Sequence, residues 1–193
     1  RELHARQRPK MIFFEQGSLS EEQFRKGVHA AIQAQSFIPV FVTSATSNIG
    51  VARLMDFIAK YGSSPVDRKT VQAMDENNEP IEISLNDKEA ACYIFKTISE
   101  AHVGELSFCR LYSGEIRQGM EMYNTDRNCS EKIGQIYTLM GHNRDSIEKI
   151  GPGDIGVMVK LKDTHTGNTL SSPGRKVKLS AVEYPKPNIH GAL

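Results

Sequence analysis

The sequence predicts an α/β segment followed by an all-β barrel, with a change of character near residue 68. Before that point, apolar side chains recur at helical spacing on both sides of one short, continuous apolar run. After it, turns rich in glycine and asparagine return about every eight to twelve residues between strand-like segments. Short strands at such even spacing are typical of a closed barrel or a sandwich.

An amphipathic helix is expected first, over about residues 19–34. Ser20 stands three residues before Gln23, which is the spacing of a capping box. Ser18 stands in the same relation to Glu21. Apolar side chains then recur along one helical face: Phe24, Val28, Ala31 and Ile32.

A strand, a loop and a second helix are expected over residues 37–62. The run FIPVFV, at 37–42, is continuously apolar, which is typical of a strand covered on both faces in a mostly parallel sheet. After the loop, Gly62 stands where a left-handed helix end favours glycine. The helix before it is predicted from its apolar repeat: Val51, Leu54, Met55 and Ile58.

Residues 63–80 are polar, contain two prolines and show no period, so a linker that leads into a turn is predicted there. Barrel strands are expected downstream, in segments such as EIRQGMEMYN, EKIGQIYTL and IGVMVKL. GPGDIG, at 151–156, is interpreted as a glycine-rich hairpin turn, because a strand-like segment follows it where a dinucleotide site requires a helix.

Composition excludes several classes of function. With 24 basic and 23 acidic side chains, the chain has no global field that attracts nucleic acid or membrane, so any such contact is local. Cys92, Cys109 and Cys129 include no CxxC pair and fit reduced thiols in a cytosolic protein. No apolar run reaches membrane-spanning length, and we expect a cytoplasmic protein without a membrane partner.

The sequence shows no self-sufficient active site. The phosphate-binding pattern GxxxxGK[ST] has two near misses, in which Met120 and Val157 stand where the lysine is required. The six histidines form no HxH or HExxH pair, so no metal site is expected. GxSxG is missing as well, and we predict no catalytic residue.

Several strings, in their order along the chain, resemble the elongation factor G family of translational GTPases. FIPVFVTSATSNIGVARLMDFIAKYGSSPVD resembles the C-terminal end of the family's GTP-binding domain. VGELSFCRLYSGEIRQGMEMYN and IEKIGPGDIGVMVKLKDTHTGNTL resemble its β-barrel domain II, and VEYPKPNIHGAL resembles the crossing into domain III. The likeness spans roughly residues 12–193. It implies the end of a P-loop GTPase domain over 1–68, a barrel of the translation-protein type over 69–185, and the start of the link to domain III over 186–193.

Three departures accompany the resemblance. Asn168 replaces the Asp of the family's TGDTL string, and Gly62-Ser63 replaces a Leu-Pro pair. The start, RELHARQRPK, does not match what the resemblance implies upstream of the first helix. These differences favour a divergent paralogue or a variant factor over the housekeeping protein.

The resemblance implies that Ser44 and Ala45 belong to the loop that presents backbone N–H groups to guanine. GTP and Mg²⁺ would be cofactors of an intact parent, a GTP hydrolase whose P-loop and switch regions this chain lacks. One or two neutral hydrogen bonds contribute about 1 to 3 kcal/mol, whereas micromolar affinity requires about 8 kcal/mol. We therefore expect no cofactor, no GTP binding and no hydrolysis for the chain alone.

For the barrel, the resemblance implies docking on the small ribosomal subunit through the rRNA backbone, by a monomeric factor that promotes translocation. Acidic neighbours leave open that each basic side chain there is ordinary solvated charge. The candidate phosphate contacts are Arg117, Arg144, Lys160 and Lys162.

Alternatives remain. A ribosomal protection factor of the tetracycline-resistance type or a GTPase release factor would share the same barrel. A barrel that binds another protein without ribosome contact would reuse the scaffold. A self-contained small-molecule enzyme rests on GPGDIG alone.

Overall fold

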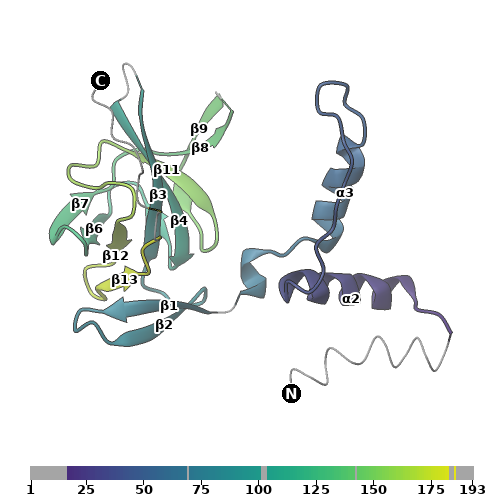
Figure 1. Ribbon diagram of the computed structural model, residues 1–193. Coiled ribbons are helices and arrows are strands. Elements are labelled where there is room, and N and C mark those ends of the chain that lie inside the picture. Colours follow the sequence, from purple (N-terminus) through teal and green to yellow (C-terminus); the bar gives the residue numbers. More distant parts are fainter. Residues whose placement is uncertain (1–16, 69, 101–103, 142, 183–184, 186–193) are drawn as a thin grey trace. The chain divides into compact units, whose positions relative to one another are not determined.

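The computed structural model describes residues 17–68, 70–100, 104–141, 143–182 and 185, and the chain forms two compact units (Figure 1). The first unit ends at Asp67 and the second begins at Arg68. The start RELHARQRPK and the predicted link over 186–193 lie outside the described residues. In the part that the structure describes, no helix has the length and apolarity needed to span a membrane.

The first helix, α2 (Glu21–Gln33), confirms the predicted amphipathic helix and its start. Ser20 Oγ accepts the Gln23 amide proton at 3.2 Å, and Gln23 Oε1 accepts the Ser20 amide proton at 2.9 Å. This reciprocal capping box satisfies two N–H groups that have no partner inside the helix. The sequence signal therefore fixes where the helix begins.

The second helix, α3 (Val51–Tyr61), packs on α2 and on the segment between the two helices through aromatic rings. Phe24 of α2 meets Tyr61 edge-on at 6.5 Å between ring centroids, and Phe41 lies 4.7 Å from Phe57. His29 Nδ1 lies 3.2 Å from the Tyr61 carbonyl, which ties α2 to the end of α3. The short helix η1 (Pro65–Asp67) follows.

Gly62 ends α3 differently from the prediction. Its φ of −65° and ψ of 150° are extended, so the expected left-handed conformation is wrong. The position favours glycine for a different reason, because a Cβ there would lie 2.5 Å from the Ile58 carbonyl oxygen. Close approach of the chain to the helix end requires the small residue.

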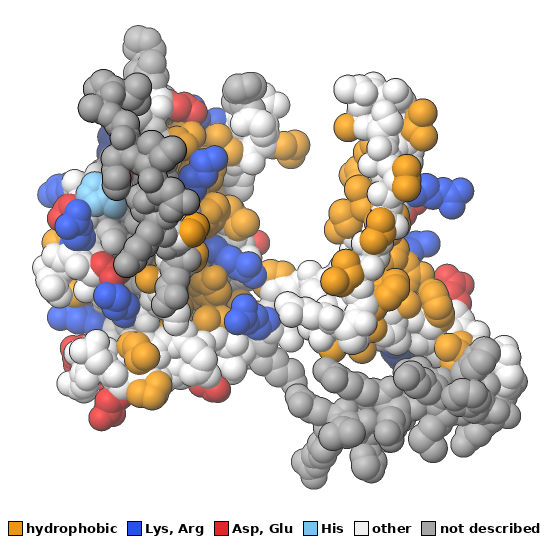
Figure 2. Space-filling view, in the orientation of Figure 1, with side chains coloured by type: hydrophobic (Ala, Val, Ile, Leu, Met, Phe, Trp, Pro, Cys, Tyr) orange, Lys and Arg blue, Asp and Glu red, His pale blue; other side chains and the backbone are white. Residues whose placement is uncertain are grey.

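The predicted buried strand over 37–42 is wrong for this structure. The segment has no regular secondary structure and joins no ladder, and Val42 is 97% exposed. A strand requires a hydrogen-bonded neighbour, and no strand lies beside it among the described residues of this unit. Figure 2 shows hydrophobic side chains along the surface of this unit, in which no described residue is buried.

The second unit is all β, with every paired strand antiparallel to its neighbours. Eight strands form one sheet in the order β7-β6-β12-β3-β4-β11-β8-β9; β13-β1-β2 and β10-β5 form two smaller sheets. The strands are β1 (Thr70–Asp75), β2 (Pro80–Ser84), β3 (Ala91–Glu100), β4 (Gly104–Ser113), β5 (Ile116–Arg117), β6 (Glu121–Asn124), β7 (Cys129–Lys132), β8 (Ile136–Met140), β9 (Asn143–Ile147), β10 (Lys149–Ile150), β11 (Ile155–Val159), β12 (Thr169–Ser171) and β13 (Val177–Leu179).

The predicted all-β barrel is confirmed, but its sheets are open, whereas the strand spacing predicted a closed barrel or a sandwich. Its largest sheet ends at β7 and β9, and no ladder joins these two edges in the described ranges. Ile116 of β5 and Ile150 of β10 are nevertheless buried in the same apolar cluster as the large sheet. The two-stranded ribbon thus contributes to the core where hydrogen bonding does not close the sheet.

The core follows the alternation of side chains along β3. Cys92 and Ile94 point into the main cluster, whereas Ala91 and Tyr93 point out under the three-stranded sheet. Both faces of the strand are buried, which explains its continuous apolar sequence. A hydrogen bond to the Cys109 thiol, together with burial, holds the pKa of the Cys92 thiol well above its usual range.

Two segments between these strands differ from their predictions. The predicted linker over 63–80 contains β1, where small Ala73 is 2% exposed and pairs with Leu179 of β13. GPGDIG forms a turn, but β10 before it pairs with β5, while β11 after it pairs with β4 and β8. The turn therefore joins two sheets and does not close a hairpin.

Candidate nucleic-acid interface and guanine loop

The predicted guanine loop is a closed turn. Ser44 and Ile49 exchange two backbone hydrogen bonds of 3.0 Å each, and the Asn48 amide donates to the Ala45 carbonyl at 3.2 Å. Asn48, at φ 52°, and Gly50, at φ 75°, supply the left-handed conformations that bring the chain into α3. The loop is thus shaped by its own backbone.

Gly50 also allows this loop to pack closely against the segment before it. A Cβ at Gly50 would lie 3.1 Å from the Val42 carbonyl oxygen. Ala45 is exposed, and its N–H has no backbone acceptor among the described residues. Ser44 and Ala45 can therefore offer a small, accessible backbone edge, but no group that binds phosphate lies in this loop.

Of the four basic residues predicted to contact RNA, Arg117 lies in an ion-paired cluster. Its Nε is 2.5 Å from Glu115 Oε1, and Lys149 Nζ is 2.6 Å from Glu115 Oε2. These two cations, Lys149 first, lower the pKa of the Glu115 carboxyl from its ordinary value. Pairing with Glu115 reduces the charge that Arg117 can offer to a phosphate.

Arg144, in β9, is paired as well. Its Nη2 forms an ion pair with Glu100 at the end of β3, and its guanidinium lies 5.8 Å from the Tyr137 ring centroid. Both contacts hold the side chain against the sheet. The two predicted arginines therefore have partners within the barrel.

Lys160 and Lys162 differ from the arginines. Both side chains are exposed, and neither forms an ion pair in the part of the chain that the structure describes. They lie on the connection between β11 and β12, which we call the 160–168 loop. The four predicted contacts thus lie on three separate elements of the barrel, and only the two lysines lie on the same element.

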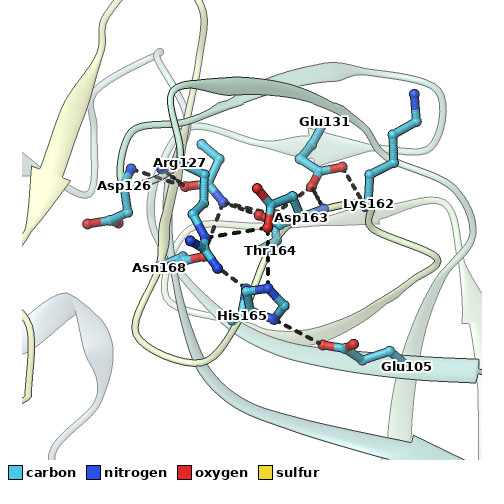
Figure 3. A network of polar contacts seen from close by, with 10 residues as sticks. Glu105, Asp126, Arg127, Glu131, Lys162, Asp163, Thr164, His165 and Asn168 are labelled. Atoms are coloured by element: carbon cyan, nitrogen blue, oxygen red, sulfur yellow. Dashed lines mark hydrogen bonds and ion pairs between the residues drawn. The ribbon is translucent and has the colours of Figure 1, made fainter.

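Beneath the 160–168 loop lies a buried carboxylate that the sequence analysis missed. Glu131 is 1% exposed and accepts three hydrogen bonds from the loop (Figure 3). Its donors are the Lys162 amide at 2.9 Å, the Asp163 amide at 2.7 Å and the Thr164 hydroxyl at 2.8 Å. One signal was available, because Glu131 stands two residues before the buried Ile133, just past the end of β7, and alternate residues of an extended chain point to the same side.

Asn124, fully buried at the end of β6, is the second support. Its side-chain amide donates to the Asp163 carbonyl at 3.1 Å and to Thr164 Oγ1 at 3.0 Å. Its Oδ1 accepts the amide protons of Asp126 and Arg127, each at 3.1 Å. Asn124 therefore joins the β6–β7 turn to the 160–168 loop.

Charged side chains hold the loop from the outside. Asp163 Oδ1 lies 3.4 Å from Arg127 Nε and 3.3 Å from His165 Nε2, and His165 Nδ1 lies 4.0 Å from Glu105 (Figure 3). Partial burial, with Glu131 and Asp163 nearby, raises the pKa of the Cys129 thiol. The loop is consequently fixed on both sides while its lysines remain exposed.

Most of this barrel is similar to a known domain. Residues 89–173 match the family model of elongation factor G domain 2. This part of the chain, which contains most of the barrel strands, is similar to elongation factor G domain 2. A crystal structure of a protein from Thermus thermophilus is similar over 93% of this chain, with 21% sequence identity and a TM-score of 0.71. That likeness shows the fold, and the chain spans 25% of the length of that protein.

The whole loop network lies within residues 89–173, the region similar to elongation factor G domain 2, whereas Ser44 and Ala45 lie outside that region. Asn168, where the resemblance implies an Asp, accepts the His165 amide proton at 2.9 Å and an Asn124 amide proton at 3.2 Å through Oδ1. An aspartate oxygen would accept the same two bonds. The departure therefore leaves the loop in place.

A groove of about 400 Å³ opens beside the β6–β7 turn of the barrel. Lys176 Nζ lies 4.2 Å from the Tyr123 ring centroid, and Lys178 pairs with Asp126 at 2.8 Å. Two acidic side chains, Asp75 and Glu76, line the groove together with the two lysines. The balanced charges favour no ligand class. In the described ranges, no group of three or more His, Cys, Asp and Glu side chains is placed to hold a metal.

Proposed function

We propose that the chain is part of an elongation factor G-type translational GTPase, whose barrel docks on the small ribosomal subunit through the rRNA backbone. The observation that carries the proposal is the match of residues 89–173 to elongation factor G domain 2. Lys160 and Lys162 support it, since they are exposed, free of ion pairs among the described residues and carried on a fixed loop. Phosphate contact by such side chains positions a protein on structured RNA.

The parent protein would bind GTP with Mg²⁺ and hydrolyse GTP during translocation. In that protein, the accessible backbone edge at Ser44 and Ala45 would recognise guanine. The chain itself contains no phosphate-binding pattern. One or two hydrogen bonds to guanine would contribute about 1 to 3 kcal/mol, whereas micromolar affinity requires about 8 kcal/mol. Calorimetry with the chain alone should therefore show no micromolar GTP binding.

Sedimentation with purified ribosomal subunits tests the docking proposal. We expect the full chain to pellet with small subunits in preference to large ones, and to be released as salt increases. The double variant Lys160→Ala/Lys162→Ala should lower the slope of log affinity against log salt by about two, one for each phosphate that a lysine no longer neutralises. Equal binding to both subunits, or binding without salt dependence, would contradict the proposal.

A further inference from the structure

The 160–168 loop has a conformation that its own sequence does not favour. Lys160 has a φ of 59°, in the left-handed region that non-glycine residues rarely adopt. The end of the loop is bonded to β3, where Gly167 donates to the Ile94 carbonyl at 2.7 Å and Ile94 donates to the Asn168 carbonyl at 2.9 Å. The two consecutive amides of the loop at Lys162 and Asp163 donate to the buried Glu131 carboxylate. The shape of the loop therefore depends on a side chain from another strand.

Burial of a carboxylate without a cation is costly unless hydrogen bonds compensate for the lost water. Glu131 has three such bonds, all from the loop. Asn124 adds two donors to the same segment, at the Asp163 carbonyl and Thr164 Oγ1. Neither side chain reaches the surface, since Glu131 is 1% and Asn124 0% exposed. They can therefore affect a ligand at the surface only through the loop that they support.

The acidic side chain of the loop has partners other than the two lysines. Asp163 is the nearest acidic neighbour of Lys162 in sequence, and its carboxylate is directed to Arg127 and His165. Lys160 and Lys162 thus remain available to an anionic partner. A loop that is fixed before binding avoids the entropy cost of ordering on the partner.

We infer that Glu131 and Asn124 are positioning residues for RNA binding, which act by holding the 160–168 loop so that Lys160 and Lys162 contact phosphates together. This inference rests on the proposed ribosomal function. It adds that the affinity for RNA depends on two buried side chains that never contact the RNA.

A double-mutant comparison on the full chain tests the inference, with small ribosomal subunits and a protein-free RNA hairpin as probes. Glu131→Gln should weaken binding about tenfold, the reduction expected for about two phosphate contacts at moderate salt. It should also lower the salt slope as far as Lys160→Ala/Lys162→Ala does. Combined with those two changes, Glu131→Gln should weaken binding little further, because all three substitutions remove the same contacts. Glu121→Gln, at an exposed position of β6, is the matched control.

Amide hydrogen exchange separates positioning from general stability. Glu131→Gln should accelerate exchange at Lys162 and Asp163 while Cys109, in the barrel core, keeps its protection. If Glu131→Gln does not fold, Thr164→Val removes two hydrogen bonds on the loop side, one donated to Glu131 and one accepted from Asn124. Thr164→Ser keeps the hydroxyl and should retain binding.

The outcomes distinguish the two proposals. A wild-type chain that binds neither probe overturns the ribosomal function and, with it, this inference. Two results overturn the inference alone, provided that the wild-type chain binds. In the first, the losses of affinity from Glu131→Gln and from Lys160→Ala/Lys162→Ala simply add; in the second, Glu131→Gln and Thr164→Val leave the salt slope unchanged.

Discussion

The two units of the chain use apolar residues in opposite ways. In the first unit no described residue is buried, and Ile38, Val40 and Val42 are all more than 80% exposed. In the second, three apolar clusters are buried, and Ile94 is fully enclosed. Similar apolar sequence therefore gives a core in one unit and a surface in the other. The difference teaches that an apolar run specifies burial only together with the strands that pair beside it.

The largest predicted difference between the units comes from truncating one isoleucine in each. Ile94→Ala should lower the free energy of unfolding of the barrel by about 2 to 5 kcal/mol, because it leaves a cavity in the main cluster. Ile58→Ala, at a side chain that is 59% exposed, should change stability by less than about 0.5 kcal/mol. Hydrogen exchange during denaturant titration reports each unit separately. Equal destabilisation of both units would contradict the comparison.

A smaller effect is expected from filling space in the barrel. An ideal Cβ at Gly156 would lie 2.3 Å from Ile150 Cδ1, across the contact between β11 and the β5–β10 ribbon. Gly156→Ala should therefore destabilise the barrel by about 1 to 3 kcal/mol, measured by thermal unfolding. Gly174→Ala, where no atom lies within 4 Å, is the control and should be near neutral. A neutral Gly156→Ala would show that the ribbon is not held against the sheet.

In the first unit the largest local effect should come from the helix cap. Ser20→Ala removes the acceptor for the Gln23 amide and should destabilise α2 by about 0.5 to 2 kcal/mol. Far-UV circular dichroism should show a loss of helix, which Ser20→Asp restores because a carboxylate caps equally well. Loss of barrel structure in Ser20→Ala would contradict the division into two units.

The smallest predicted effect is a pH dependence in the barrel. A hydrogen bond from Arg175, then one from the Ser84 amide, lowers the pKa of the Asp87 carboxyl. The folded pKa is below the unfolded one, so this stabilisation is present above the ordinary aspartate value of about 3.9. It is lost as the pH falls through the folded pKa. Asp87→Asn should make unfolding less sensitive to acid over this range, and an unchanged acid profile would exclude the contribution.

Local signals in the sequence predicted local structure well. The Ser20–Gln23 spacing located the start of α2, and the apolar repeat located α3 within one residue of its end. The punctuated segments located β6, β8 and β11. These features depend on neighbours within one turn or one strand, which a sequence shows directly.

Features that depend on distant partners were not predictable in the same way. β1 lay hidden in the expected linker because its inward side combines Val71 with small Ala73. One of its two partner strands, β2, follows it directly, but the other, β13, lies about a hundred residues away in sequence. The strand expected over 37–42 depends on neighbours that the described residues of its unit do not supply. Glu131 was not singled out in the sequence, because its three donors come from a loop thirty-one to thirty-three positions further on. Chain topology, and not local composition, decides each of these.

The two buried thiols inside the barrel allow its opening to be followed by alkylation. Cys92 and Cys109 are both 0% exposed, and the Cys92 thiol stays protonated far above neutral pH, so an alkylating reagent cannot modify it in the native state. The reagent can modify Cys92 only after β3 and β4 separate, so the rate of modification measures how often the whole barrel opens. Cys129 is half-buried near the surface, so its faster alkylation serves as the internal reference for the slow reaction of Cys92.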